Sequence, residues 1–154
     1  MAAAVAAAPR WLPDCKYVEL IQVLNCCIAL QYRDETFMQA CLQRGLQLLG
    51  QQQPNRQGRS NRPLLAAERD KVVGICCLSV ATLDLRSLAG PACELVSRSG
   101  IGQRVSAHKA NLSKLWVFHS WLLQHQLLDG KGLTGMLMQQ QLQQGAKDVA
   151  MGLI

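Results

Sequence analysis

The most reactive side chains of this 154-residue sequence are seven cysteines, namely Cys15, Cys26, Cys27, Cys41, Cys76, Cys77 and Cys93. Cysteines can form disulfides, bind a metal, act as nucleophiles or fill space in a core. Their number is odd, no signal peptide precedes them, and neither a CxxC motif nor zinc-finger Cys/His spacing occurs. Two adjacent pairs lie in apolar runs, where helical neighbours point about 100° apart and cannot easily chelate one ion. We therefore expect small, buried, unpaired side chains at these positions.

The other candidates for chemistry are three histidines, at His108, His119 and His125. No HExxH or GxSxG motif occurs, and no pair of carboxylates stands out. The helical spacing of the surrounding apolar residues predicts that His119 is a core or rim side chain. The Gly130-Lys131-Gly132 run lacks both the following Ser or Thr and the preceding strand of a phosphate loop, so it predicts a turn. The sequence therefore does not predict an enzyme. It predicts no catalytic residue, no metal site, no cofactor and no small-molecule substrate.

The composition favours a folded, helical chain. Apolar residues make up 49% and charged residues 17%, which is typical of a globular domain. Aromatic residues make up only 5%, whereas Leu and Gln are abundant, which disfavours a β-sandwich. The net charge of +6 suits a polyanionic partner. No apolar run is long enough to span a bilayer, so we expect no membrane insertion.

Apolar residues recur at helical spacing in six segments, at residues 17–31, 36–49, 65–83, 88–98, 111–126 and 134–145. We expect Thr36 to cap the second of these helices. Joined by short turns, the six helices make three hairpins, with a flexible Gln/Arg/Gly insert after the first. The expected units are an Ala-rich N-terminal segment at 1–15, which could be disordered, helical hairpin repeats at 16–50, 64–99 and 108–145, the insert at 51–63 and a tail at 146–154.

The first two hairpins form an internal repeat. An offset of 53 residues places Leu30 over Leu83 and Arg33 over Arg86. Without the insert the period would be roughly 40 residues, which is typical of stacked helical hairpins. The third unit has a similar length but matches less well. The sequence therefore predicts an all-α fold, a right-handed α-solenoid segment of about three antiparallel helical hairpins.

Two stretches give this repeat a family resemblance. Residues 19–32, ELIQVLNCCIALQY, resemble the first helix of an octotricopeptide repeat, and residues 112–122, LSKLWVFHSWL, resemble a segment late in green-algal members and their FAST-kinase-like relatives. The usual Trp of the repeat is replaced by Asn25 and Leu78, and the RAP domain that commonly follows is missing. The resemblance implies an RNA-binding protein of a mitochondrion or chloroplast, acting in RNA processing, stability or translation. It also implies that the chain could be a fragment.

Basic side chains in two acid-free windows, and at the two repeat-equivalent positions, are the candidates for contacts with single-stranded RNA, because they would attract backbone phosphates. These RNA-binding candidates are Arg33, Arg86, Arg56, Arg59, Arg62, Arg98, Arg104, Lys109 and Lys114. Arg33 and Arg86 are the best single candidates, since equivalent positions of successive repeats face one groove. We expect Trp116 and Trp121 to pack in the fold rather than to stack on bases.

The alternative function is a protein-interaction scaffold with the same solenoid fold, such as a ribosome-associated or assembly factor that binds other organellar proteins. The two hypotheses differ in a measurable way, because phosphate contacts make RNA affinity fall steeply with salt. The Ala-rich start could be the remnant of a targeting segment, a linker or an arbitrary start within a longer protein.

Overall fold

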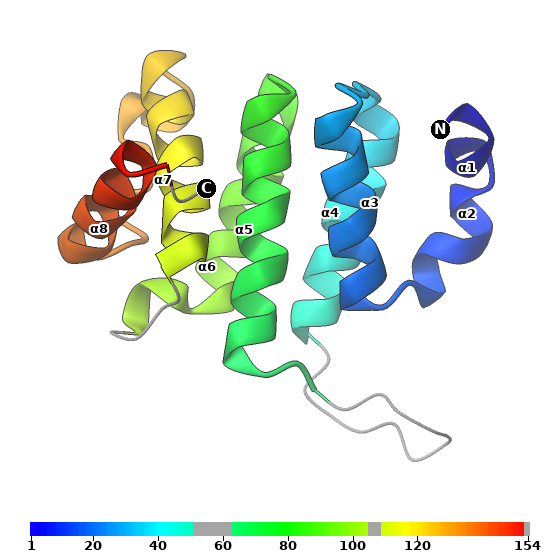
Figure 1. Ribbon diagram of the computed structural model, residues 1–154, viewed down its shortest axis with the longest axis horizontal. Helices are drawn as coiled ribbons and strands as arrows, with labels where there is room; N and C mark the ends of the chain where they lie inside the picture. Colours follow the sequence, from blue (N-terminus) through cyan, green and yellow to red (C-terminus); the bar gives the residue numbers. More distant parts are fainter. Residues whose placement is uncertain (51–62, 105–108, 153–154) are drawn as a thin grey trace.

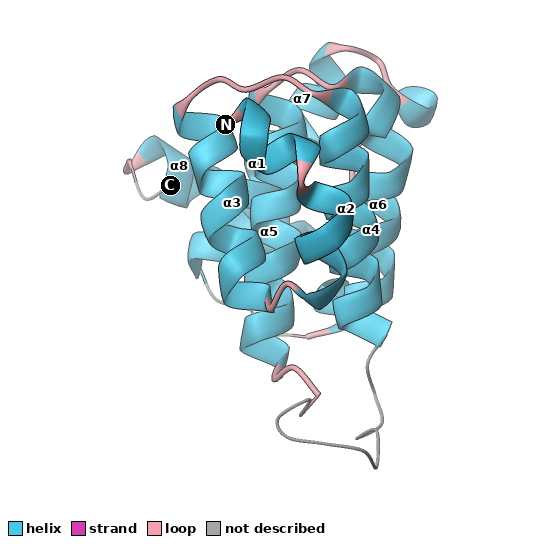
Figure 2. Cartoon of the chain, turned by 90° about the vertical axis from the view of Figure 1, so that its right-hand side faces the viewer, coloured by secondary structure: helices cyan, strands magenta, loops and turns pink. Residues whose placement is uncertain are grey.

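The described part of the protein is helical and contains no strand (Figures 1 and 2). The computed structural model describes residues 1–50, 63–104 and 109–152. Within these ranges the α-helices are α1 Ala2–Ala6, α2 Ala8–Trp11, α3 Tyr17–Ala29, α4 Glu35–Gly50, α5 Ala66–Thr82, α6 Ala89–Ser99, α7 Lys109–Gln124 and α8 Gln139–Ala150. Short 3-10 helices lie at η1 Leu12–Asp14, η2 Arg86–Leu88, η3 Ile101–Gln103 and η4 Leu128–Gly130. The predicted all-α class is therefore confirmed.

The longer helices stand side by side in two layers. Helices α3, α5 and α7 form a row in which each packs against the next, and α4 and α6 pack against each other behind α3 and α5 (Figure 1). Helix α8 packs along α7 at one end of the row, and α1 and α2 lie at the opposite end. Among the described residues, no helix combines the length and apolarity that crossing a membrane would require.

Small side chains allow the two layers to pack closely. A Cβ on Gly45 of α4 would lie 3.5 Å from Cys76 Sγ and 3.6 Å from Val72 Cγ1, both on α5. Cys41 of α4 is also buried close to Cys76. Six of the seven cysteines are buried, as the sequence predicts, but Cys26 is exposed. The prediction is wrong there because Cys26 lines an open groove beside the N-terminal segment.

The same turn ends α3, α5 and α7. In each case a residue with positive φ follows the helix, at Gln31 (φ 50°), Asp84 (φ 52°) and Gln126 (φ 52°). The next N–H then donates back to a carbonyl five residues earlier, over 2.9–3.0 Å in the pairs Tyr32–Cys27, Leu85–Val80 and Leu127–Leu122. This pattern is a Schellman motif. The first two turns are 53 residues apart and make the same backbone hydrogen bonds.

The third unit departs from the predicted hairpin. The expected helix at 134–145 starts too early, because turns occupy 131–136 and the helical residues begin at Gln139, in α8. The reason is a tertiary contact: the N–H of Leu133 donates to Nδ1 of His119 over 2.9 Å, and Gly132 (φ 56°) lies against the same imidazole. Helix α8 then runs through Ala150, so most of the predicted tail is helical.

The N-terminal segment is also ordered into helices rather than disordered. The Trp11 indole N–H donates to the Ala4 carbonyl over 3.0 Å, and the Trp11 ring lies 6.3 Å from the Phe37 ring on α4. Arg44 of α4 donates to the Cys15 carbonyl over 2.9 Å, which ties the segment to the first hairpin.

The cap of α4 lies two residues earlier than predicted. Asp34, not Thr36, caps this helix, because its Oδ1 accepts the N–H of Phe37 over 2.8 Å. The predicted insert at 51–63 lies outside the described residues except for Pro63.

Candidate nucleic-acid interface

Arg33 and Arg86 occupy equivalent places, two residues after the positive-φ position of their turns. Both side chains are exposed, and both turns lie at the same edge of the row, the upper edge in Figure 1. We call this the turn edge, formed by residues 30–34, 83–86 and 125–128. The third turn carries Leu128 at the equivalent position, with 47% of its surface exposed. The turn edge therefore presents two arginines in succession and then an apolar side chain.

Arg86 is held by a weak ion pair. Its Nε donates to Oδ1 of Asp84 over 3.3 Å, and the two side chains are 55% and 37% exposed. Exposed pairs of this kind contribute little to stability, so a phosphate can replace the carboxylate as a partner. The pKa of Asp84 is lowered, mainly by the hydrogen bond from the Trp121 indole and then by Arg86.

The tryptophans serve packing, as predicted, most clearly Trp121. Its indole Nε1–H donates to Asp84 Oδ1 over 3.0 Å, and 7% of the residue is exposed. Trp121 also stacks on Phe118, with ring centroids 5.8 Å apart, while Trp116 lies 5.2 Å from the His119 ring. The Trp121 bond anchors α7 to the turn that carries Arg86.

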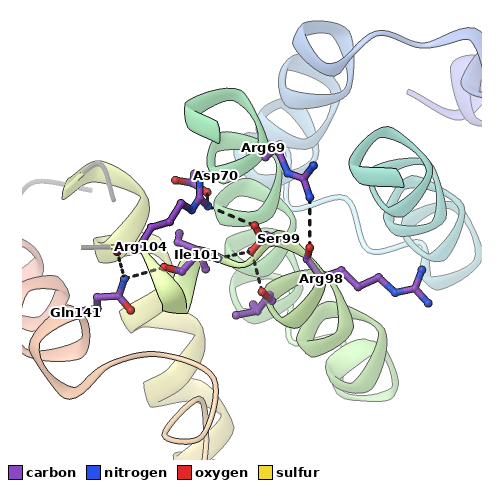
Figure 3. A network of polar contacts seen from close by, with 8 residues as sticks. Arg69, Asp70, Arg98, Ser99, Ile101, Arg104 and Gln141 are labelled. Atoms are coloured by element: carbon purple, nitrogen blue, oxygen red, sulfur yellow. Dashed lines mark hydrogen bonds and ion pairs between the residues drawn. The ribbon is translucent and has the colours of Figure 1, made fainter. Parts of the chain in front are cut away.

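Arg104 belongs to a structural network rather than to an open basic surface (Figure 3). Its guanidinium pairs with Asp70 of α5, whose side chain is 4% exposed, and also donates to the Ser99 carbonyl over 3.4 Å. Burial raises the pKa of Asp70, and Arg104 opposes that rise. The Gln141 amide of α8 donates to the carbonyls of Ile101 and Arg104 over 2.8 and 2.9 Å. Arg104 thus joins α5, η3 and α8, and its charge is already engaged.

Arg98 lies on α6 beside a side chain that the sequence analysis missed. Arg98 pairs with Glu94 over 2.7 Å, and Nη2 of Arg69 donates to the Arg98 carbonyl over 3.3 Å (Figure 3). Arg69 and Arg98 together line a small hollow with Leu46, Leu49 and Gly50. The acid-free windows exclude Arg69 because Glu68 and Asp70 flank it in the sequence.

Lys114 lies half-buried between α5 and α7, over Gly74. Burial lowers its pKa, and the neighbouring Lys71 of α5 lowers it further. Lys71 is exposed and was also missed, since it follows Glu68 and Asp70. Both of those carboxylates are occupied: Glu68 caps α5 at the Leu65 N–H over 2.8 Å and accepts the Tyr17 hydroxyl over 2.9 Å, and Asp70 holds Arg104. A prediction that treats every acid as a neutralising charge overlooks such cases.

The four remaining candidates are Lys109, Arg56, Arg59 and Arg62. Lys109 is the first residue of α7. Arg56, Arg59 and Arg62 lie outside the described residues. The structure therefore places Arg33 and Arg86 on one edge, Lys114 on the α5–α7 face, and Arg98 and Arg104 near the end of α6. It does not bring all the predicted residues together.

Three of the candidates for other chemistry, His119, Cys76 and Cys93, are buried. His119 is 5% exposed, burial lowers its pKa, and its Nδ1 accepts the Leu133 N–H, which confirms the predicted core histidine. Burial raises the pKa of the Cys76 thiol to about 12 and that of Cys93 to about 11, so both stay protonated at neutral pH. Within the described ranges, no three His, Cys, Asp or Glu side chains are grouped so as to hold a metal ion.

Comparison with protein families, with curated proteins and with solved structures finds no match to this chain. The resemblance to octotricopeptide repeats therefore stays a hypothesis based on the residues quoted above.

Proposed function

We propose that this protein binds single-stranded RNA as a short α-solenoid, and that it acts in organellar RNA processing, stability or translation. The observation that carries the proposal is the equivalence of Arg33 and Arg86, which follow identical backbone turns in successive hairpins and are both exposed. The resemblance to octotricopeptide repeats supplies the organellar setting. The net charge of +6 favours a polyanion.

The two arginines suit a phosphate backbone. Adjacent helices pack about 8–10 Å apart, so arginines in successive turns can reach phosphates of one strand. A guanidinium binds phosphate through charge-assisted, often bidentate hydrogen bonds. Arg86 exchanges Asp84 for the phosphate, whereas the Arg33 side chain has no hydrogen-bond or ion-pair partner among the described residues. Leu128 offers no charge to continue the series, so the turn edge supplies two phosphate contacts, and this predicts modest affinity.

RNA binding can be tested with the full 154-residue chain and a fluorescein-labelled mixed-sequence single-stranded RNA. The test variant is R33E/R86E, and R10E/K147E is a matched control because it changes two other exposed basic side chains by the same total charge. We expect the control to retain most of the affinity. The test variant should bind more weakly, and its log–log salt slope should fall by about 1.4, since each phosphate contact on a single strand contributes about 0.7.

Three outcomes would overturn the proposal. No binding at low salt would exclude an RNA site on this chain. Equal weakening of both variants would mean that net charge, rather than the turn edge, attracts RNA. Competition by polyglutamate as effective as competition by unlabelled RNA would indicate an acidic protein as the partner.

A further inference from the structure

An open groove lies at the α3 end of the helix row, and we call it the N-terminal groove. It has a volume of about 710 Å³ and is lined mostly by apolar surface. Figure 2 looks onto this end, with α1 and α2 in front of α3 and α4. The lining residues come from α1 to η1, from α3 and from the start of α4, and they are Met1, Ala4, Trp11, Asp14, Cys15, Glu19, Gln22, Val23, Cys26 and Phe37.

The α3 wall of this groove is a single helical stripe. Its residues are Glu19, Gln22, Val23 and Cys26, which follow the i, i+3, i+4, i+7 spacing of one helix face. Val23 is partly buried, and the other three are exposed. A stripe with this spacing is the surface that a helix uses to pack against another helix.

The equivalent stripe of the next hairpin shows what this surface does when it is covered. The offset of 53 residues leads to Val72, Ile75, Cys76 and Ser79 of α5, and none is more than 2% exposed. Val72 and Cys76 lie against Gly45 of α4, which belongs to the preceding hairpin. In the second hairpin, therefore, this stripe is a helix-binding surface. In the first hairpin, the same stripe borders an open groove.

The charge of the lining residues indicates which kind of helix the groove would bind. Two carboxylates, Asp14 and Glu19, line the groove, and no Lys or Arg is among its described lining residues, although the protein carries a net charge of +6; one oxygen of Glu19 also accepts the Lys16 N–H over 2.8 Å. RNA would meet these acids unfavourably. From the buried equivalent stripe and this charge, we propose that the N-terminal groove binds an amphipathic helix of a partner protein, with Leu-like side chains on one face and Lys or Arg beside them. This goes beyond RNA binding and uses a different surface.

Cys26 provides a direct reporter of occupancy. It is the exposed cysteine of the seven, whereas Cys15 in the same groove is 2% exposed. Alkylation of Cys26 by iodoacetamide, followed by mass spectrometry, therefore measures access to the groove. The probe is a designed 14-residue amphipathic peptide with Leu at i, i+3, i+4 and i+7 and four flanking Lys. Its matched control has the same Leu pattern with four Glu.

We expect the Lys peptide to slow Cys26 alkylation and to bind about fivefold more tightly than the Glu peptide, because each of two exposed charge pairs makes a small favourable contribution. The D14N/E19Q variant should lose this preference, whereas E94Q, which removes an exposed acid of α6, should keep it. V23R should block both peptides while leaving the salt-dependent RNA affinity unchanged. Circular dichroism checks that each variant folds.

Several results would overturn the inference. Equal binding of the Lys and Glu peptides, or binding without protection of Cys26, would exclude the charge-selected helix site. Protection of Cys26 that grows with protein concentration in the absence of peptide would assign the groove to a second copy. Protection by the apolar dye anilinonaphthalene sulfonate but by neither peptide would assign it to a small apolar ligand.

Discussion

The two ends of the helix row present opposite surfaces. At the α8 end, the outward side chains are polar, with Gln140, Gln143 and Lys147 exposed. At the α3 end, Val23 and Cys26 border an open apolar groove. The end units of a helical stack need a polar outer face to stay soluble. Helix α8 thus presents a polar face at its end of the row, whereas the α3 end presents the apolar groove that we propose as a helix-binding site.

The largest expected effect comes from the network that holds α8 in place. The change R104A removes the partner of Asp70 and leaves a carboxylate 4% exposed without its cation. Breaking such a pair costs about 3 kcal/mol. We expect this loss in the free energy of unfolding by urea at pH 7. The Arg104 carbonyl also accepts a hydrogen bond from the Gln141 amide of α8. Rearrangement of η3 in R104A should therefore loosen α8, so that the α8 end becomes less closed, like the α3 end.

The pH dependence of R104A separates the ion pair from simple loss of packing. Burial already raises the pKa of Asp70 above its ordinary value, and removal of Arg104 should raise it further. A carboxyl whose folded pKa exceeds its unfolded value destabilises the fold when ionised, and this cost disappears as pH falls through the folded pKa. The loss in the free energy of unfolding caused by R104A should therefore become smaller as the pH falls from 7 to 4. A loss in the free energy of unfolding that does not change with pH would contradict this account. The control is R10A, which removes an exposed arginine.

Two glycines compare the packing of α8 at one end of the row with that of α4 against α5 and α6. A Cβ on Gly145 of α8 would lie 2.5 Å from the Leu112 carbonyl oxygen of α7, whereas one on Gly45 of α4 would lie 3.4 Å from a Leu95 methyl. We expect G145A to destabilise by about 1–3 kcal/mol, since backbone must shift. G45A should be neutral or stabilising, because Ala favours a helix by about 1 kcal/mol over Gly. Thermal and urea unfolding of both variants would measure the difference, and equal losses would show that α8 packs no more tightly than α4.

Local patterns predicted the first two hairpins better than the third. The apolar period marks α3 to α6, and the overlay of Arg33 on Arg86 matches turns with the same hydrogen bonds. The start of α8 could not be predicted this way, because a bond between Leu133 and His119 holds the preceding residues in turns.

The predictions for the site residues also failed where a contact joins residues that are distant in the sequence. Arg104 looked free because its partner, Asp70, lies far from it in the sequence. Lys71 looked neutralised because Glu68 and Asp70 are close in the sequence, although both are engaged elsewhere. The exposure of Cys26 depends on which hairpin stands at the end of the row, which periodicity alone does not reveal.

The smallest expected effect tests how far the repeated turns are alike. Gln31 and Asp84 occupy the same positive-φ position, where a side chain costs about 1–2 kcal/mol relative to Gly. Gly is also more flexible when unfolded, so we expect Q31G to stabilise by only about 0.5–1 kcal/mol. D84G removes the same backbone strain, but it also removes the acceptor of the Trp121 indole N–H. A buried donor without an acceptor costs about 1–3 kcal/mol. D84G should therefore be neutral or destabilised in urea unfolding.

The third turn supplies the control for this pair. Gln126 has the same φ as Asp84, and Q126G should follow Q31G. If D84G gained as much stability as Q31G and Q126G, Trp121 would have found another acceptor, and the second turn would differ from the first only in charge. If D84G alone lost stability, Asp84 would be the residue that ties α7 to the turn presenting Arg86. The same backbone turn would then only end α3 in the first hairpin, whereas in the second hairpin it would end α5 and also anchor α7.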